Sequence, residues 1–204
     1  MYYSQYGEEK IIDNFFKGKR RGLCIDVGAA DGIRFSNSRR LIESMDWAAL
    51  LIEPHPTYFR QLVHLYKNNE NVCLKNIAVY STSGEMPFYL YGHDAHAQVS
   101  TLSENFKERV CDIHGDKYEK EPILVQVKTL EDTLEGLSQI DFLSVDCEGV
   151  DMEVLASNNW NNHRPALVCV EHNMPKRELD SFMKTVGYTI FQRTVGNSFF
   201  NIKG

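Results

Sequence analysis

The chain has 204 residues, of which 43% are hydrophobic and 25% are charged, and its formal net charge is −6. This length favours a single domain, and the composition excludes a disordered or collagen-like chain. The negative charge argues against a protein that binds long tracts of nucleic-acid phosphate, and no apolar run is long enough to span a bilayer.

Strand and helix patterns alternate along the first 80 residues. Short apolar runs predict buried strands over 23–27, 48–52 and 72–79. Apolar residues at helical spacing predict helices over 8–16, 36–46 and 57–68. Repeated strand–helix units with continuously apolar strands are typical of a mostly parallel sheet that is covered by helices on both faces.

The alternation is interrupted between residues 80 and 128. Strand patterns over 86–91 and 123–127 flank a polar stretch with one predicted helical turn at 103–112. We expect about 92–122 to be an inserted segment that acts as a lid or binds the substrate. His93 and His96 lie in it without a third ligand at a metal-binding spacing, so an exposed loop is favoured there over a metal site.

The C-terminal part resumes the alternation of strands and helices and then ends in two successive strand patterns. Helices are predicted over 130–134, 150–157 and 176–186, and strands over 140–145 and 166–170. The last two strand patterns, 188–193 and 197–202, enclose Val195-Gly196 and predict a β-hairpin. We therefore expect one α/β domain over residues 1–204, with a doubly wound, mostly parallel seven-stranded sheet and a C-terminal antiparallel hairpin. This order of elements is typical of class I S-adenosylmethionine (SAM) methyltransferases.

The chain contains five cysteines, none of them in a CxxC pair. An odd number without such pairs is not typical of a disulfide framework or a zinc ribbon. Free thiols indicate a reducing compartment, so we expect a cytoplasmic protein. The first residues do not resemble a secretory signal, because they lack a basic segment followed by an apolar one.

A glycine-containing turn follows the first predicted strand. In doubly wound sheets, ligands bind outside the carboxyl ends of the strands. Asp26, Gly28 and Gly32 match an acidic-x-Gly-x-Gly-x-Gly pattern of SAM-binding proteins, with Ala30 in the middle position. A pyrophosphate-binding GxGxxG turn would need glycine at Ala30 and Ile33, which argues against a nicotinamide cofactor. A purely structural turn is the alternative.

The second predicted strand ends at Glu53-Pro54. An acidic residue in this place, roughly 20 residues after the glycine turn, can accept hydrogen bonds from both hydroxyls of a ribose. A solvated glutamate is the alternative, but the separation from the turn favours the ribose role.

Acidic residues also follow the fourth and fifth core strands. Asp146, Glu148 and Asp151 follow one strand, and Glu171 and His172 end the other. Carboxylates that converge on one cleft repel each other, so such a cluster indicates a base with a raised pKa, a cation site, or acceptors for substrate hydroxyls. For Asp151, a simple preference for a helix N-terminus remains open.

Several short segments carry a family resemblance. They are Ser4-Gln5-Tyr6-Gly7-Glu8-Glu9, Ile25-Asp26-Val27-Gly28-Ala29, Asp31-Gly32, Ser36-Asn37, Asp46-Trp47, Ile52-Glu53-Pro54, Asn76-Ile77-Ala78, Thr129-Leu130-Glu131-Asp132, Ile140–Gly149 and Val154-Leu155. In these segments, from about residue 4 to residue 172, the sequence resembles the FkbM family of SAM-dependent methyltransferases. The family often has Asp in place of Glu9 and Gly in place of Asp46.

The resemblance implies a Rossmann-like fold, SAM as the methyl donor, and O-methylation of a hydroxyl on a sugar, glycan or related small molecule. It implies that Glu53 holds the ribose, Ala78 borders the adenine, and Asp146 and Glu148 face the methyl group and the acceptor. The residues that it assigns to the cofactor are Gln5, Asp26, Gly28, Ala29, Asp31, Asn37, Glu53, Pro54, Ala78 and Asp146.

The catalytic candidates are Asp146, Glu148, Glu171 and His172, each of which could take the hydroxyl proton. A magnesium ion held by Asp146, Glu148 and Glu171 is the alternative, since it would acidify the hydroxyl. Two other functions stay open: 2′-O-methylation of a nucleic acid or its cap, which the net charge does not favour, and a non-catalytic scaffold module. The oligomeric state is left open.

Overall fold

A computed structural model describes residues 3–92, 98–172 and 174–202, so His93 and His96 lie outside the described residues. The helices are α1 (Glu8–Phe16), α2 (Arg39–Met45), α3 (Pro56–Tyr66), α4 (Glu104–His114), α5 (Leu130–Thr133), α6 (Asp151–Ala156) and α7 (Lys176–Thr185). The strands are β1 (Leu23–Val27), β2 (Ala48–Ile52), β3 (Val72–Lys75), β4 (Ala78–Val79), β5 (Gly84–Phe88), β6 (Ile123–Lys128), β7 (Phe142–Val145), β8 (Leu167–Glu171), β9 (Tyr188–Arg193) and β10 (Asn197–Ile202). None of the helices in these ranges is long and apolar enough to cross a membrane.

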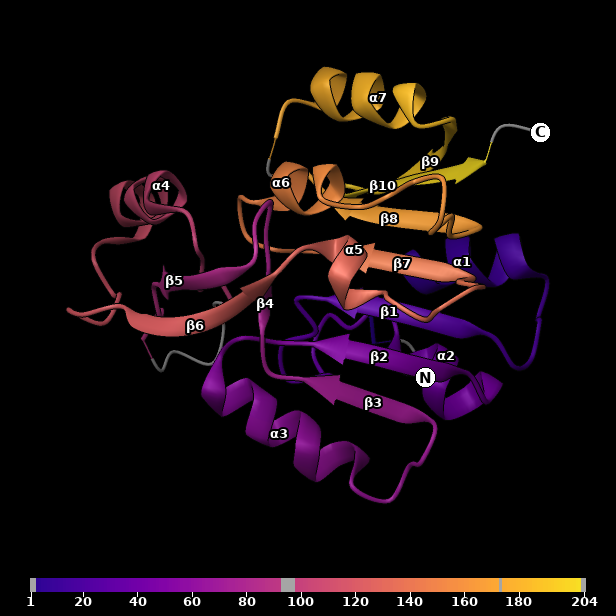
Figure 1. The fold of residues 1–204 in the computed structure, drawn as a ribbon, viewed down its shortest axis with the longest axis horizontal. Coiled ribbons are helices and arrows are strands. Elements are labelled where there is room, and N and C mark those ends of the chain that lie inside the picture. Colours follow the sequence, from indigo (N-terminus) through magenta and orange to yellow (C-terminus); the bar gives the residue numbers. More distant parts are fainter. Residues whose placement is uncertain (1–2, 93–97, 173, 203–204) are drawn as a thin grey trace.

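Seven strands form the main sheet, in the order β3-β2-β1-β7-β8-β10-β9 (Figure 1). The five strands from β3 to β8 pair in parallel, whereas β10 runs antiparallel to both β8 and β9. The predicted sheet and its C-terminal hairpin are confirmed. The strand order reverses between β1 and β7, and ligands of such sheets bind at this point, outside the carboxyl ends of the strands.

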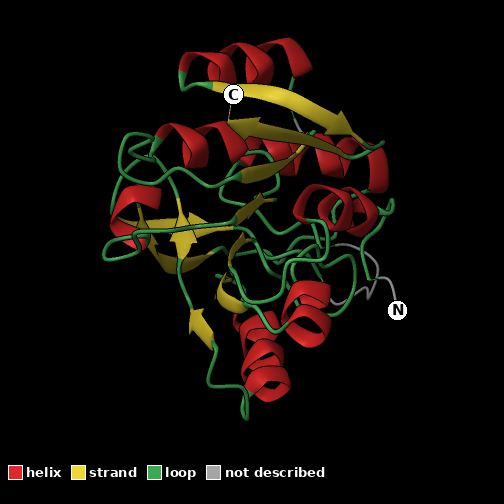
Figure 2. Ribbon diagram, turned by 90° about the vertical axis from the view of Figure 1, so that its right-hand side faces the viewer, coloured by secondary structure: helices red, strands yellow, loops and turns green. Residues whose placement is uncertain are grey.

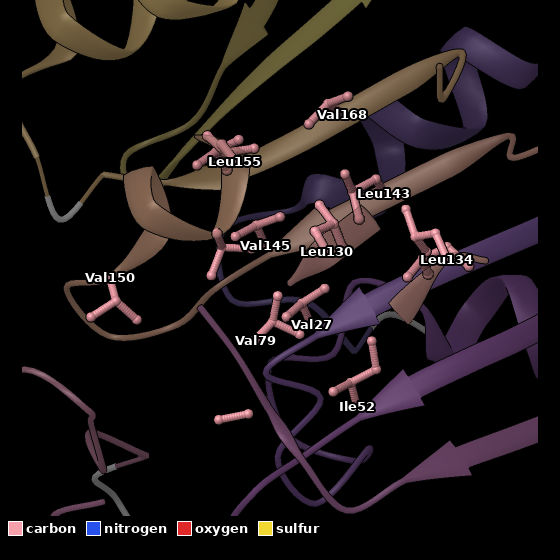
Figure 3. Packing of buried hydrophobic residues seen from close by; sticks show 14 of the residues in the cluster. Val27, Ile52, Val79, Leu130, Leu134, Leu143, Val145, Val150, Leu155 and Val168 are labelled. Atoms are coloured by element: carbon pink, nitrogen blue, oxygen red, sulfur yellow. The ribbon is translucent and has the colours of Figure 1, made fainter. Parts of the chain in front are cut away.

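Both faces of the main sheet are covered by helices (Figure 2). Successive side chains of a strand point to opposite faces, so a strand that is buried on both faces, such as β7, supplies two cores. Phe142 packs in the core beneath α1, α2 and α3, whereas Leu143 and Val145 pack beneath α5, α6 and α7. Figure 3 shows the β7 side chains next to Leu130 of α5 and Leu155 of α6.

The stretch that interrupts the alternation forms a second sheet, in the order β4-β6-β5. The strand predicted over 72–79 is wrong as a single element. The pairing with β2 ends at Lys75. Ala78 and Val79 form a separate strand, because they pair in parallel with Val127 and Lys128 of β6. The second sheet and α4 lie beyond the carboxyl ends of the parallel strands, on the left of Figure 1.

Two other predicted boundaries also shift. The strand predicted over 86–91 spans Gly84–Phe88, and Tyr89 and Tyr91 beyond it form only isolated bridges, to Thr101 and Tyr118. The helix predicted from residue 36 begins at Arg39, because Ser36 Oγ accepts a hydrogen bond from the Arg39 backbone N–H at 3.1 Å. A serine that bonds to the backbone in this way favours a turn over a helix interior.

The carboxyl ends of β1 and β7 approach each other at Gly28, where no side chain would fit. Gly28 has φ of +86°, and a Cβ atom added to it would lie 1.9 Å from the carbonyl oxygen of Asp146. The backbone N–H of Asp146 donates to Val27 O at 3.0 Å, and that of Gly28 donates to Ile52 O at 3.0 Å. The glycine therefore joins the ends of three neighbouring strands.

We expect Gly28→Ala to destabilise the fold more than Gly136→Ala does. Gly136 has φ of +82° with nothing within 4 Å of an added Cβ atom, so this control carries the backbone strain without the overlap. The loss in free energy of unfolding should be at least about 2 kcal/mol larger for Gly28→Ala, because the strands must separate. Urea denaturation of both variants measures this difference. Equal losses of unfolding free energy would contradict the steric constraint at Gly28.

Candidate active site

Two neighbouring cavities open at the carboxyl ends of the parallel strands. The inner cavity holds about 640 Å³ of empty space and lies between β1, β2, β7 and the second sheet. The outer cavity holds about 1290 Å³ and lies between the N-terminal segment, the insertion and the end of β8.

Gly28, Glu53, Pro54, Ala78 and Asp146 are the predicted cofactor residues that line the inner cavity. Its remaining wall is largely apolar. Ile77 of this wall belongs to one of the family segments, whereas no motif indicated Tyr58, Phe88 and Leu102. Phe88 reaches this place as the last residue of β5 in the second sheet, and Leu102 lies in the loop before α4.

Glu53 is held in one orientation by the backbone. Its Oε2 accepts a hydrogen bond from Ala30 N at 2.8 Å, and its Oε1 accepts one from His55 N at 2.7 Å. Burial raises the pKa of Glu53 to about 7, although these two hydrogen bonds favour the charged form. The side chain is 5% exposed and faces the inner cavity. It is therefore fixed in place before any ligand binds.

Asp26 and Asn37 are buried beneath the site. Asp26 accepts a hydrogen bond from Ser38 Oγ at 2.5 Å, which ties β1 to the start of α2. Burial raises the pKa of Asp26 to about 6. Asn37 Nδ2 donates to Ser144 Oγ of β7 at 3.3 Å. These contacts hold α2 against the sheet.

Asp31 organises the turn after β1. Its Oδ1 accepts hydrogen bonds from the backbone N–H groups of Ile33 and Arg34, and its Oδ2 pairs with the Arg34 guanidinium at 2.8 Å. Of the residues that the structure describes around the two cavities, Asp26, Ala29, Asp31 and Asn37 are not among the lining ones. Their assignment to the cofactor remains a prediction.

Three carboxylates meet where the two cavities join. Asp146, Glu148 and Glu171 each place an oxygen within 4.8 Å of the others. Burial, followed by the charges of Asp146 and Glu148, raises the pKa of Glu171, whose side chain is hydrogen-bonded to Asp146. Burial also raises the pKa of Asp146, whose Oδ1 is shielded from solvent and has no hydrogen-bond partner among the described residues.

Asp151 supports the loop that carries this cluster. It is fully buried at the start of α6, and its Oδ1 accepts a hydrogen bond from Cys147 N at 2.8 Å. Burial, followed by the charge of Asp146, raises the pKa of Asp151 to about 7. Asp151 thus does more than begin a helix, since its side chain closes the loop from 146 to 151.

His172 faces the C-terminal hairpin. Its Nε2 lies 2.6 Å from Ser198 Oγ, and its Nδ1 lies 3.3 Å from the carbonyl oxygen of Val195. Burial lowers the pKa of His172. Both ring nitrogens are therefore engaged on the hairpin side, and the geometry favours a carboxylate as the base.

The outer cavity combines aromatic and polar side chains. Gln5, which the family resemblance assigns to the cofactor, lies here. The aromatic lining residues are Tyr6, Phe35, Tyr91 and Phe106, and the amides are Gln5, Gln98 and Asn197. The segment predicted as an insertion supplies several of them, although residues 93–97 of it lie outside the described ranges. Gln5 and Tyr6 lie in one of the family segments, but no sequence motif marks Phe35, Tyr91, Gln98, Phe106 or Asn197, which join them only through the tertiary structure.

The two cavities share Gln98, Asp146 and Glu148. A ligand in the inner cavity and a second one in the outer cavity would therefore meet at these side chains. Carboxylates in this position can accept a proton from the second ligand or bind its hydroxyl groups. The arrangement suits the transfer of a group between two bound molecules.

The family described as the methyltransferase FkbM domain matches residues 26–190. No curated protein sequence matches the chain.

Solved structures of methyltransferases share the fold. The FkbM methyltransferase of Methylobacillus flagellatus has a TM-score of 0.56 and 14% identity, over 88% of this chain and 43% of that protein. A putative methyltransferase of Escherichia coli has a TM-score of 0.52 and 13% identity, over 100% and 89%. A putative RNA methyltransferase of Pyrococcus horikoshii has a TM-score of 0.51 and 11% identity, over 97% and 87%. At these identities the likeness shows the fold alone, and the chain spans less than half the length of the Methylobacillus protein.

We expect the protein without ligand to lose stability as the pH rises from 5 to 8. The pKa values of Asp26, Glu53 and Asp151 are about 6, 7 and 7, above the ordinary value near 4, so the folded state binds these protons more tightly. The stabilisation is complete below pH 4 and is lost as the pH rises through 6–7.

The variant Asp151→Asn tests this pH dependence. Asparagine keeps an acceptor for Cys147 N–H but carries no titrating proton, so the fall in unfolding free energy between pH 5 and pH 8 should shrink by on the order of 1–4 kcal/mol. Glu70→Gln removes one exposed carboxyl and serves as the charge-matched control. Denaturation curves at both pH values measure the unfolding free energies of the wild-type protein and both variants. If the fall in unfolding free energy from pH 5 to pH 8 is the same in Asp151→Asn as in the wild-type protein, the prediction is wrong.

Proposed function

The chain belongs to the FkbM family of methyltransferases, and from this premise we propose that it transfers a methyl group from SAM to a hydroxyl of a sugar or related small molecule. The inner cavity would hold SAM and the outer cavity the acceptor. One observation carries this proposal: the two cavities meet at Asp146 and Glu148.

The residues that line the inner cavity offer groups that suit the parts of SAM. The close approach at Gly28 leaves backbone rather than a side chain on the floor of the cavity. Glu53 offers acceptor oxygens for the ribose hydroxyls, and Ala78 and Phe88 offer an apolar surface for the adenine. When bound, SAM supplies a methyl group on a sulfonium, which is already a strong electrophile.

The outer cavity suits an acceptor that carries several hydroxyl groups. Its amides and carboxylates can accept or donate hydrogen bonds to hydroxyls, and its aromatic rings offer flat apolar walls. Because ordinary ligand sites combine apolar walls with few polar groups, this density of polar groups favours a polyol such as a sugar.

Glu148 is the proposed base. Asp146 and Glu148 both face the two cavities, and the side chain of Asp146 is hydrogen-bonded to Glu171. Alignment of the hydroxyl with the methyl group would supply most of the rate enhancement. Transfer of the hydroxyl proton to the Glu148 carboxylate would add roughly 10²- to 10⁴-fold.

A magnesium ion held by Asp146, Glu148 and Glu171 is the alternative to this base. The mutual spacing of their oxygens, within 4.8 Å, favours it, whereas the raised pKa of Glu171 opposes it, because a metal ligand must be deprotonated. Turnover in the presence of EDTA decides between the two: a base alone predicts unchanged turnover, and a metal-assisted reaction predicts its loss.

Glu53→Ala should weaken SAM binding by at least about tenfold, since each hydrogen bond to a charged group contributes about 1.5–3 kcal/mol. Calorimetric titration of the wild-type protein, Glu53→Ala and the exposed control Glu135→Ala with SAM measures the effect. A parallel titration with NAD should show no binding. If SAM binds Glu53→Ala as tightly as the wild-type protein, Glu53 does not hold the ribose.

Glu148→Gln should lower turnover by about 10²- to 10⁴-fold and leave the Kd for SAM within about threefold. Formation of S-adenosylhomocysteine is followed with a panel of monosaccharides and nucleoside-diphosphate sugars as acceptors. Undiminished turnover in this variant would remove Glu148 from the mechanism. If no acceptor is turned over although SAM binds, the sugar proposal itself fails.

A further inference from the structure

We propose that Thr101 is a positioning residue for methyl transfer: its buried hydroxyl holds the backbone at Glu148 so that the Glu148 carboxylate stands between the two cavities. This inference rests on the proposed function and adds a residue from the insertion to a site otherwise built on strand ends. Thr101 itself is not among the described residues that line either cavity, so it would act only through Glu148.

Glu148 has an unusual backbone conformation. Its φ is +51°, in the left-handed region that residues with a side chain adopt only when their surroundings hold them there. Gly149 follows with φ of +95°. This pair reverses the chain directly after β7. The direction of the Glu148 carboxylate therefore depends on whatever fixes this reversal.

Thr101 fixes it from the insertion. Its Oγ1 donates a hydrogen bond to the carbonyl oxygen of Glu148 at 2.7 Å and accepts one from Ser103 N at 2.8 Å. Because the hydroxyl accepts from Ser103, its own hydrogen is directed to Glu148. Thr101 is 1% exposed, and its backbone exchanges hydrogen bonds of 2.8 and 3.1 Å with Tyr89.

The same part of the insertion also packs on Gly149. The ring of Phe106 covers this glycine so closely that an added Cβ atom would lie 2.7 Å from Phe106 Cδ2. Ser103 Oγ accepts a hydrogen bond from Phe106 N at 3.1 Å, so the first turn of α4 continues directly from the Ser103–Thr101 contact. Thr101 and Phe106 thus hold two consecutive residues of the reversal.

The main sheet holds the rest of the loop. Asp146 N donates to Val27 O at 3.0 Å, and Cys147 N donates to Asp151 Oδ1 at 2.8 Å. The carbonyl of Glu148 is instead held from the insertion, through Thr101. The segment that lines the outer cavity therefore also orients the proposed base, which couples acceptor binding to proton removal.

The test compares Thr101→Val with Thr101→Ser. Valine keeps the branched shape of threonine but has no hydroxyl, and serine keeps the hydroxyl. Thr101→Val should lower kcat by about 10- to 100-fold, the cost expected of a displaced reactive group, with the Kd for SAM within about threefold. Thr101→Ser should stay within about threefold of the wild-type kcat. Valine and serine variants that lose kcat equally would overturn the proposal.

A double-mutant cycle separates positioning from a general loss of structure. If Thr101 acts through Glu148, adding Thr101→Val to Glu148→Gln should lower kcat by less than about twofold further. A purely structural role predicts that the two effects multiply. Multiplying effects would therefore overturn the proposal.

Amide hydrogen exchange tests the role of Thr101 without an acceptor, so a failure of this proposal can be told apart from a failure of the proposed function. Thr101→Val should speed exchange in residues 147–150 at least about tenfold, and Thr101→Ser should not. If the wild-type protein binds SAM but turns over none of the acceptors, the sugar proposal fails and exchange decides whether Thr101 holds Glu148. Exchange in Thr101→Val that matches the wild-type protein would overturn the role of Thr101.

Discussion

The whole site depends on the close approach of two backbones at Gly28. The carbonyl of Asp146 occupies the space where any other residue would carry its side chain, so β1 and β7 converge at the point where the strand order reverses. Glu53 at the end of β2 is joined to the same turn through Ala30 N. Because these contacts are made by backbone, the positions of Glu53 and Asp146 are set by the sheet rather than by mobile side chains.

Around this point the protein buries more carboxyl groups than stability alone would favour. Each is stabilised in a different way: Glu53 by backbone N–H groups, Asp26 by Ser38, Asp151 by Cys147 N, and Asp146 by its hydrogen bond with Glu171. Burial raises the pKa of each of these acids. Groups with pKa values raised in this way are frequent at functional sites, where a destabilised charge is ready to accept a proton.

The second sheet, α4 and the loop 98–103 before α4 have two roles in the same place. They close the inner cavity with Phe88 and Leu102 and contribute Phe106 to the wall of the outer one. Their contacts with Glu148 and Gly149 also hold the chain reversal after β7. A change of acceptor-binding surface in this segment would therefore alter the orientation of Glu148 as well.

Local sequence patterns determined the elements of the main sheet, their order and the strand ends that carry Gly28, Glu53 and Asp146, because periodicity and turn residues act over a few positions. Only the tertiary structure decided that Ala78 and Val79 leave β3 to pair with β6, and that the ring of His172 turns to the hairpin. It alone placed Thr101 against Glu148. These contacts join residues that are far apart in the chain, and a local sequence pattern does not indicate which distant residues pair.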